Sequence, residues 1–316
     1  LVFRWLKMKY IEFGANKQKV SKIALGCMRI PELNVLEIVN LLETSLDAGI
    51  NFLDIADCYS KGKAESLLGE AFSKQTSLRD NFFLQSKCGI RKDPDLTYYD
   101  FSKDYIISCV EGSLKRLNTD HLDCLLLHRP DALMDPSEIG EAFNKLLSDG
   151  KVLNFGVSNM NPMQMKYLKS GLDCPICANQ VQLSVCHTPM INAGFNTNMD
   201  NDPAIMRDGG ILEYCKLNGI VVQAWSVMQY GFFKGVFVGS PLYLKLNSVL
   251  DKIASELNVS SQVVAIAWVL KVAKLMQAVI GTTKATRVID SAKAGDIELT
   301  RKQWYEIYLA AGNELP

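Results

Sequence analysis

Eight short apolar segments recur along the chain, and longer amphipathic stretches separate them. The segments are Ile23–Gly26, Ile50–Ile55, Phe82–Lys87, Leu122–His128, Val152–Val157, Ala178–Leu183, Ile220–Trp225 and Ala278–Ile280. Strand-length apolar runs that alternate with helical stretches indicate parallel strands, because a helix must carry the chain back between them. Eight such units predict an α/β chain folded as a closed (β/α)8 TIM barrel.

The stretches between these segments have helical patterning. Asn34–Asp47 and Ala64–Ser73 read as amphipathic helices, and Gly49 closes the first. In the third helical stretch small or apolar residues recur at helical spacing, namely Ile106, Val110, Ser113 and Leu117. Each helix can therefore lay one face on the sheet.

Two additions extend the minimal barrel of about 250 residues. Met8–Val20 is expected to form an N-terminal β-hairpin that plugs the bottom of the barrel. Thr300–Ala311 is expected to form an additional C-terminal helix with Thr300 as its N-cap. Residues 1–7 precede a natural-looking start at Met8 and are set aside as an upstream or added segment. Residues 8–316 then form a single barrel domain, since no linker interrupts them.

Composition excludes several classes of protein. The 34 basic residues balance 34 acidic ones, which argues against binding to nucleic acid. The longest apolar runs, such as Val263–Leu270, are far shorter than the roughly 20 residues of a membrane helix. Nine scattered cysteines without a signal peptide favour a soluble chain in a reducing cytoplasm. The oligomeric state has no signature in the sequence.

Two long loops stand out, because loops of this length usually carry function. Thr188–Pro203 is rich in Asn and follows the sixth strand, and Val227–Asn247 follows the seventh. In a barrel both loops lie at the C-terminal face, where active sites are built. The first loop and the one after Tyr98-Tyr99 are expected to shape the substrate pocket.

Four polar residues sit at or just beyond the ends of successive strands: Asp54, Tyr59, Lys87 and His128. Taken singly, each has an ordinary structural reading, but strand ends of a parallel barrel meet at one rim, so the four can share a pocket. A tyrosine pKa of about 10 is too high for an efficient acid near neutral pH, and an adjacent Lys87 ammonium would lower it. Asp54 would hold that ammonium, and His128 would polarise a substrate carbonyl.

Other sites are poorly supported. The chain contains neither G-x-G-x-x-G nor G-x-x-x-x-G-K-[ST], which argues against a Rossmann dehydrogenase and a P-loop enzyme. The lone Cys174-Pro175-Ile176-Cys177 motif lies a strand away from Cys186 and His187, so a zinc site is not expected. A metal-dependent lyase or hydrolase would need a carboxylate and histidine cluster at the strand ends, which the sequence lacks.

Several ordered motifs resemble those of the aldo-keto reductase family, with a likeness to the bacterial YdhF-like oxidoreductase branch. They are Asn51–Tyr59 with Glu65–Glu70, Leu125–Asp131, Gly150-Lys151 with Gly156–Asn159, Asn179–Val181 and the ending Leu299–Tyr305. The resemblance implies a barrel with NADPH across its mouth that reduces an aldehyde or ketone to an alcohol. It makes Tyr59 the proton donor of an NADP-dependent alcohol dehydrogenase acting on a small-molecule carbonyl substrate. The alternative is an NADPH-binding, redox-sensing regulatory module like the potassium-channel β-subunits, which the family includes.

The resemblance also assigns the residues that hold NADPH or NADP+. Those at the carboxamide and the nicotinamide ring are Ser158, Asn159, Gln180 and Trp225, with Gly26, Cys27, Met28 and Asp54 at their border. Those of the loop over the pyrophosphate are Ser226, Met228 and Gly231. Gly281, Thr282 and Thr283 start a helix suited to a phosphate, and Lys284 and Arg287 suit a 2′-phosphate. Many relatives carry Glu-Asn at the adenine contact, where this chain has Asp290-Ser291.

Overall fold

A computed structural model describes residues 8–316 of the chain, so the segment expected to lie upstream, residues 1–7, is outside the described part. Eight parallel strands close into a barrel in which each strand pairs with the next barrel strand along the chain. They are β3 (Ile23–Gly26), β4 (Phe52–Asp54), β5 (Phe83–Cys88), β8 (Cys124–Leu127), β9 (Phe155–Ser158), β10 (Ile176–Gln182), β11 (Val221–Trp225) and β12 (Met276–Ile280). This confirms the predicted (β/α)8 barrel.

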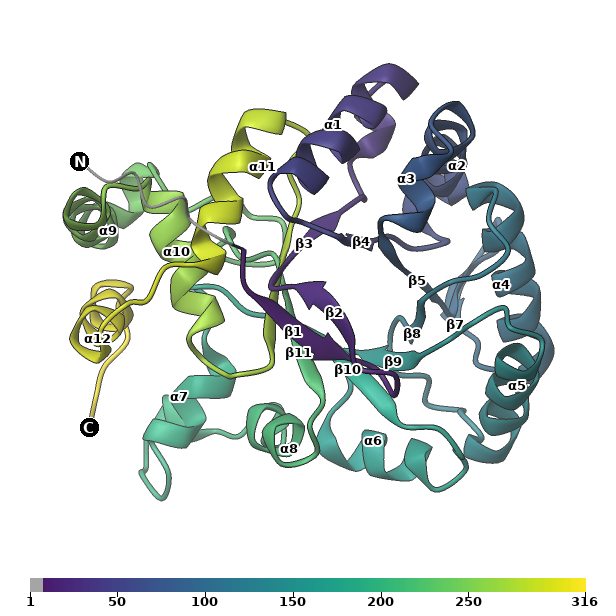
Figure 1. Cartoon of the computed structure of the whole chain (residues 1–316). Coiled ribbons are helices and arrows are strands. Elements are labelled where there is room, and N and C mark those ends of the chain that lie inside the picture. The colour runs from purple at the N-terminus through teal and green to yellow at the C-terminus, as the bar shows by residue number, and fades with distance from the viewer. Residues whose placement is uncertain (1–7) are drawn as a thin grey trace.

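Helices surround the barrel (Figure 1). They are α1 (Val35–Asp47), α2 (Lys63–Lys74), α3 (Ser77–Asp80), α4 (Lys103–Leu117), α5 (Pro136–Ser148), α6 (Pro162–Lys169), α7 (Pro189–Phe195), α8 (Ile211–Leu217), α9 (Leu244–Leu257), α10 (Ser261–Leu270), α11 (Ala285–Ala292) and α12 (Arg301–Ala310). Short 3-10 turns are η1 (Ile30–Glu32), η2 (Tyr59–Gly62), η3 (Asp202–Ala204), η4 (Pro241–Tyr243) and η5 (Lys293–Gly295). Asn34 and Thr300 cap α1 and α12 with capping boxes, as side-chain acceptors at N-caps do.

Two expectations about loops were wrong in part. The segment 188–203 is not all loop, because Pro189 takes the first position of the helix α7, where its missing N–H costs nothing. The segment 227–247 ends earlier than expected, since α9 already begins at Leu244. Several strands also differ from the predicted bounds. Apolar residues indicate which positions are buried, whereas a strand ends where its backbone hydrogen bonds to the neighbouring strands end. Val152, for example, makes only an isolated bridge to Leu122.

The N-terminal hairpin closes one end of the barrel. β1 (Tyr10–Phe13) pairs antiparallel with β2 (Gln18–Ser21), and Figure 1 shows the pair lying across the barrel opening. The ring of Phe13 lies 5.7 Å from that of Phe52 and 4.9 Å from that of Phe83, centroid to centroid. Aromatic pairs at such separations bury a large apolar area. The hairpin is therefore an aromatic plug at the bottom of the barrel, as predicted.

Above the plug, inward side chains alternate along each strand with period two, as strand geometry requires. On β5 the inward series runs from Phe83 through Gln85 to Lys87, and all three are buried. On β4 Phe52 is followed by Asp54. The barrel interior is therefore apolar at the plug and polar in the middle, with its ionisable groups at the C-terminal ends of the strands.

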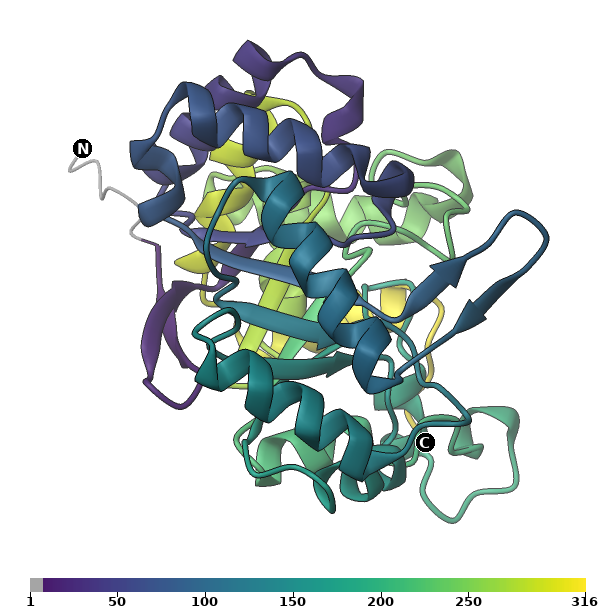
Figure 2. The ribbon, with the colours of Figure 1, turned by 90° about the vertical axis from the view of Figure 1, so that its right-hand side faces the viewer.

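The opposite end of the barrel, the mouth, carries a second hairpin. β6 (Ile90–Lys92) and β7 (Thr97–Tyr99) follow β5 and pair antiparallel. In Figure 2 this hairpin projects on the side away from β1 and β2. This hairpin was not predicted. The loop expected after Tyr98-Tyr99 is short, because β7 ends at Tyr99 and α4 begins at Lys103. The hairpin places a two-stranded wall beside the mouth.

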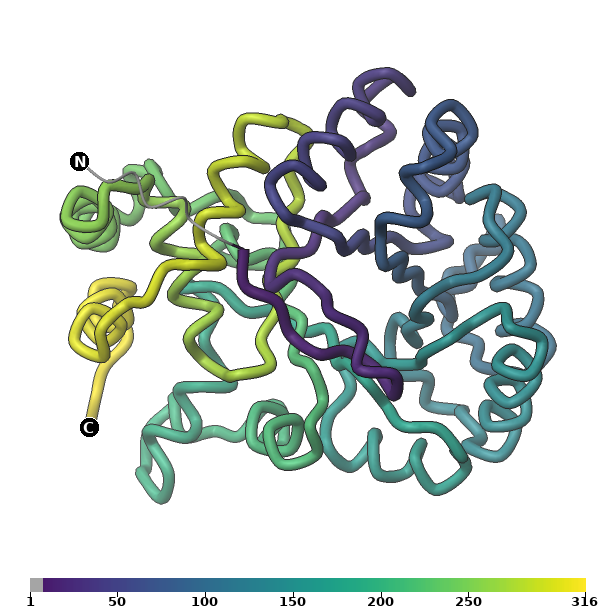
Figure 3. The backbone as a smooth tube through the Cα atoms, viewed as in Figure 1, coloured from purple at the N-terminus to yellow at the C-terminus, as the bar shows by residue number. Residues whose placement is uncertain are grey.

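The C-terminal helix packs outside the ring. α12 contacts α9, and the two helices lie side by side in Figure 3. The rings of Trp268 and Trp304 stack at 4.7 Å between α10 and α12, and each indole N–H donates to the backbone carbonyl of the other tryptophan. This reciprocal pair anchors the additional helix to the barrel.

No single helix within residues 8–316 is long and apolar enough to cross a membrane. The pair Pro241–Leu257 and Ser261–Leu270 passes that test jointly, by length and composition only, and is bent by 93°.

Candidate active site

Three of the four predicted catalytic side chains meet at the mouth around Lys87. Its Nζ lies 2.8 Å from Asp54 Oδ1 and donates to the backbone carbonyl of Ile55 at 2.8 Å and to Tyr59 Oη at 3.2 Å. Lys87 is fully buried and Asp54 is 3% exposed. A buried ammonium needs such a set of acceptors, because burial without them would be very costly. Lys87 therefore couples the carboxylate to the phenol.

The backbone after Tyr59 turns sharply. Ser60, Lys61 and Gly62 all have positive φ, at 49°, 56° and 86°. Such values are uncommon for residues other than glycine and are found where surrounding structure enforces them. The turn sets Tyr59 back over the barrel, where Lys87 Nζ lies 5.0 Å from the centre of its ring.

The electrostatics of the tyrosine differ from the sequence expectation. Lys87 does pull the pKa of Tyr59 downward, but burial of the phenol outweighs it, so the pKa lies above its usual value. Burial opposes the Lys87 ammonium as well, yet the Asp54 charge and the Tyr59 contact more than offset this, and the pKa of Lys87 is raised. The predicted lowering of the Tyr59 pKa is thus wrong for this structure. Tyr59 holds its proton as a neutral phenol beside a charged ammonium.

His128 follows β8 and faces the tyrosine edge-on, with 5.8 Å between ring centres. Burial, together with the positive charges of Lys87, Arg129 and Lys92, lowers the pKa of His128 well below its usual range. The ring is therefore neutral near pH 7 and can donate one N–H. The Nδ1 atom of His128 lies 3.6 Å from Cys58 Sγ.

Sequence reasoning missed two buried glutamines, Gln85 and Gln223, which share hydrogen bonds with Asp54 and with the predicted residue Gln180. Asp54 Oδ1 accepts from Gln85 Nε2 at 2.7 Å and from Gln180 Nε2 at 2.9 Å. Gln223 Oε1 accepts from the same two nitrogens, at 2.9 Å and 3.1 Å. A signal was present, since Gln85 stands two residues before Lys87 and Gln223 two before Trp225, on the same inward faces.

The residues predicted at the nicotinamide follow neighbouring strands. Ser158 Oγ donates to the Gln180 carbonyl at 2.9 Å and accepts from Asn159 Nδ2 at 2.7 Å. Trp225 Nε1 donates to Asn159 Oδ1 at 3.2 Å, and the Arg129 guanidinium lies 5.8 Å from the Trp225 ring centre. Ser158, Asn159, Gln180 and Trp225 thus form one hydrogen-bonded group at the mouth.

The other predicted cofactor residues lie on loops of the same rim. Gly26 ends β3, where an added Cβ would stand 3.1 Å from the Ile280 carbonyl oxygen. Cys27 is fully buried and its backbone N–H donates to the Asp54 carbonyl at 2.7 Å, whereas Met28 is exposed. Residues of the loop after β11 are partly exposed or exposed, namely Ser226, Met228 and Gly231.

The last strand leads into the predicted phosphate segment. Gly281 has open space where a Cβ would stand, and Thr282 and Thr283 are half-buried beside it. Lys284 is the N-cap of α11, and both Lys284 and Arg287 are exposed without an ion pair in the described part of the chain. Free cations at a helix start, with an approachable backbone, fit a dinucleotide phosphate. Asp290, by contrast, pairs with Lys293 at 3.0 Å.

A buried carboxyl group, Asp57, lies behind the site. Its Oδ1 is buried without a hydrogen-bond partner, and burial together with the nearby Glu65 charge raises the pKa of Asp57 to about 6. Glu65 itself accepts from Ser86 Oγ at 2.7 Å and pairs with Arg116 at 2.7 Å. For Asp57, burial and the Glu65 charge therefore outweigh the hydrogen bonds from Cys109 and Cys58 and the charge of Arg116, which favour the ionised carboxylate.

Replacing Asp57 by asparagine is expected to remove a pH dependence of stability. The unfolded chain releases this proton near pH 3.8 and the folded chain near pH 6, so the free energy of unfolding falls as pH rises through that window. A shift of this size corresponds to about 3 kcal/mol. Urea denaturation of both proteins at pH 4 and pH 8 measures it. The wild type should lose more stability than Asp57→Asn, and identical losses would contradict the assignment.

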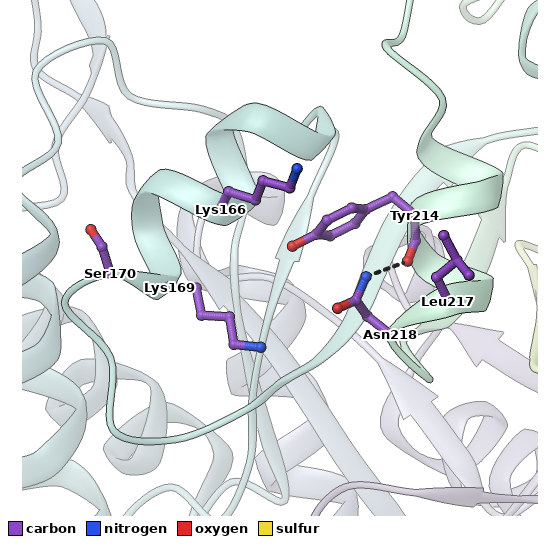
Figure 4. Close-up of a pocket in the computed structure, with 6 residues that line it drawn as sticks. All are labelled: Lys166, Lys169, Ser170, Tyr214, Leu217 and Asn218. Carbon is purple, nitrogen blue, oxygen red and sulfur yellow. Dashed lines mark hydrogen bonds between the residues drawn. The ribbon is translucent and has the colours of Figure 1, made fainter.

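An open hollow lies away from the mouth. It has a volume of about 540 Å³ and lies on the outer surface between α6 and α8, with Lys166 and Lys169 opposite Tyr214 (Figure 4). The barrel strands contribute no residue to it. Within residues 8–316 no group of three or more His, Cys, Asp or Glu side chains could hold a metal ion.

Proteins with known names resemble the chain over nearly its whole length. The oxidoreductase YdhF of Escherichia coli is 34% identical over 97% of this chain and 99% of that protein. A 6-dehydroglucose reductase of Agrobacterium fabrum is 31% identical over 95% and 98%. The fold matches an aldo-keto reductase of Klebsiella pneumoniae, solved with NADPH, with a TM-score of 0.75, 24% identity and coverage of 95% and 94%.

Together with the barrel and its mouth, these likenesses define the class, an oxidoreductase built on a (β/α)8 barrel. The family model "Aldo/keto reductase family" matches residues 22–310. The chain belongs to the aldo/keto reductase family, and the predicted likeness to YdhF is confirmed.

Proposed function

We propose that the chain is an NADPH-dependent reductase of aldehydes or ketones, of the NADP-dependent alcohol dehydrogenase type. The observation that carries this proposal is the position of Lys87 Nζ, 2.8 Å from Asp54 and 3.2 Å from Tyr59 Oη. A neutral phenol held against a permanent ammonium can give up its proton when an alkoxide forms beside it, because the ammonium stabilises the phenolate that remains.

Each catalytic side chain then has one task. Tyr59 Oη donates the proton to the carbonyl oxygen, and Lys87 stabilises the resulting phenolate. Asp54 keeps Lys87 charged, since its carboxylate lies within 2.9 Å of the ammonium. His128, neutral because its pKa is lowered, donates an N–H to the same carbonyl oxygen and fixes its pose. NADPH, when bound, supplies the hydride to the carbonyl carbon.

The cofactor would lie across the mouth. Both N–H groups of Gln180 point to Asp54 and Gln223, so the Gln180 atom left for a ligand is Oε1, an acceptor. Such an acceptor suits the carboxamide N–H of nicotinamide. Ser158 and Asn159 lie beside it, and Trp225 would offer its ring to the nicotinamide. The Klebsiella pneumoniae neighbour solved with NADPH supports this choice of cofactor.

An assay of NADPH oxidation across aldehydes, ketones, quinones and sugar aldehydes tests the function. The sugar aldehydes are included because one relative is named a 6-dehydroglucose reductase. Turnover of at least one carbonyl class is expected. Tight NADPH binding without turnover of any class would contradict the reductase and favour a redox-sensing module.

The residue Lys284 is expected to select NADPH over NADH. Its ammonium is exposed and unpaired in the described structure, at the start of α11. A lost charge-assisted contact to the 2′-phosphate should weaken NADPH binding by about tenfold or more and leave NADH binding within about twofold. Titration of Lys284→Ala with both nucleotides measures this. Lys293→Ala, which removes a lysine already paired with Asp290, is the control. Equal losses for both nucleotides would show that Lys284 does not contact the 2′-phosphate.

A further inference from the structure

We propose that Gln223 is a positioning residue, which closes a buried ring of hydrogen bonds and thereby fixes Gln180 with its Oε1 toward the nicotinamide carboxamide. This inference rests on the proposed function. It concerns Gln223, a side chain to which the proposed function assigns no contact with substrate or cofactor. Gln85, Gln223 and Gln277 are fully buried, and Gln180 is 4% exposed.

The ring has four members. Asp54 Oδ1 and Gln223 Oε1 are its two acceptors, and the Nε2 atoms of Gln85 and Gln180 are its two donors. Each nitrogen bonds to both acceptors, at distances between 2.7 Å and 3.1 Å. Strand register brings the members together, because Asp54 is paired with Gln85 and Gln180 with Gln223. All hydrogens of both amide nitrogens are therefore used within the ring.

The charge of Asp54 sets the polarity of the ring. An ionised carboxylate only accepts hydrogen bonds, so both amides must turn their nitrogens toward it. Gln223 fits this polarity because its own Nε2 donates outward, to Gln85 Oε1 at 3.1 Å and to Gln277 Oε1 at 2.8 Å. Gln277 in turn donates to the Ser21 carbonyl at 2.7 Å, on the hairpin side. The orientation of Gln223 is thus anchored from below.

The consequence reaches the cofactor through Gln180. Two bonds to Nε2, one to Asp54 and one to Gln223, hold the amide plane and direct Oε1 away from the ring. Without Gln223, one bond remains and one buried N–H loses its partner, so the amide can turn to satisfy it elsewhere. Selectivity for a carboxamide N–H should then fall.

The test compares NADPH with its reduced 3-acetylpyridine analogue, in which a methyl group replaces the carboxamide NH₂. Dissociation constants are measured by protein fluorescence or calorimetry without a carbonyl substrate, so turnover plays no part. The wild type is expected to bind NADPH at least about tenfold more tightly than the analogue, since the analogue leaves Gln180 Oε1 unpaired. In Gln223→Met the ratio should fall below about threefold.

Gln277→Met is the matched control. It makes the same change at a glutamine that is equally buried. It leaves all four ring bonds in place, because Gln223 Nε2 still donates to Gln85 Oε1 and this bond keeps the orientation of the Gln223 amide. Its ratio should stay within about twofold of the wild-type value. If Gln223→Met does not fold, Gln223→Asn serves instead, because its shorter side chain withdraws the acceptor while keeping an amide in the barrel.

Each other outcome overturns the inference. An unchanged ratio in the Gln223 variant would show that Gln223 does not hold Gln180. An equal fall of the affinity ratio in both variants would show that loss of any buried glutamine amide has this effect, and that the ring is not its cause. A wild-type chain that binds both nucleotides equally would remove Gln180 from the carboxamide. Failure of the wild type to bind NADPH at all would overturn the proposed function as well, which separates the two claims.

Discussion

Replacing Tyr59 by phenylalanine is expected to lower kcat for carbonyl reduction by about 10²–10⁴-fold, the range of general acid catalysis. The change removes only the hydroxyl to which Lys87 Nζ donates at 3.2 Å, and the aromatic ring under the ammonium is retained. Because the hydroxyl would act in the transition state of the proposed reaction, NADPH binding should change by less than about twofold. Steady-state kinetics and a nucleotide titration measure the two quantities.

Tyr10→Phe is the control for this experiment. The Tyr10 hydroxyl donates to the Gly49 carbonyl at 3.0 Å on the hairpin that plugs the barrel, remote from the mouth. That variant should keep the wild-type kcat. A Tyr59→Phe enzyme with wild-type kcat would remove Tyr59 from the reaction, whatever its geometry.

The variant Lys87→Met is expected to cost about 3–5 kcal/mol of unfolding free energy, as the loss of one partner of a buried ion pair does. Asp54 would keep its charge at 3% exposure with only neutral donors around it, from Gln85 and Gln180. Urea denaturation measures the loss. Activity should disappear as well, since the phenolate of Tyr59 would have no cation beside it.

The double variant Lys87→Met/Asp54→Asn separates stability from catalysis. Removing the uncompensated charge should recover at least about 2 kcal/mol, because a neutral amide at this position is far less costly to bury. Activity should stay absent. A double variant no more stable than Lys87→Met would show that the buried charge is not the source of the loss.

The barrel architecture and the polar residues of its mouth could be predicted from the sequence, because both follow from the alternation of apolar strands with amphipathic helices. Parallel strands deliver their C-terminal ends to one rim, so Asp54, Lys87 and His128 could be expected together from their places after successive apolar runs. Tyr59 could be expected there as well, because it lies five residues after Asp54 in the loop that follows the same strand. The left-handed turn at Ser60 and Lys61, which comes directly after Tyr59, has no clear pattern in the sequence.

The remaining features depend on packing. The direction of the Tyr59 pKa shift follows from a balance between burial and the Lys87 charge, and the extent of burial cannot be read from residue types. Gln85 and Gln223 are neutral and lie within strands, where they look like ordinary inward positions. Only the closed barrel shows that their amides meet over Asp54. The helix α7 was overlooked because the segment 188–203 is rich in asparagine, although only Asn192 lies within the helix.

The aromatic plug of Phe13, Phe52 and Phe83 affects where protons can pass between the barrel interior and solvent. Because these rings close that end, we expect the polar interior to exchange hydrogen with solvent through the mouth. In the proposed reaction, a proton that Tyr59 gives up would return through the mouth, which is also the route of the substrate. Tyr59 would then be reprotonated while the mouth is open to solvent, once in each turnover, and not through the hairpin end of the barrel.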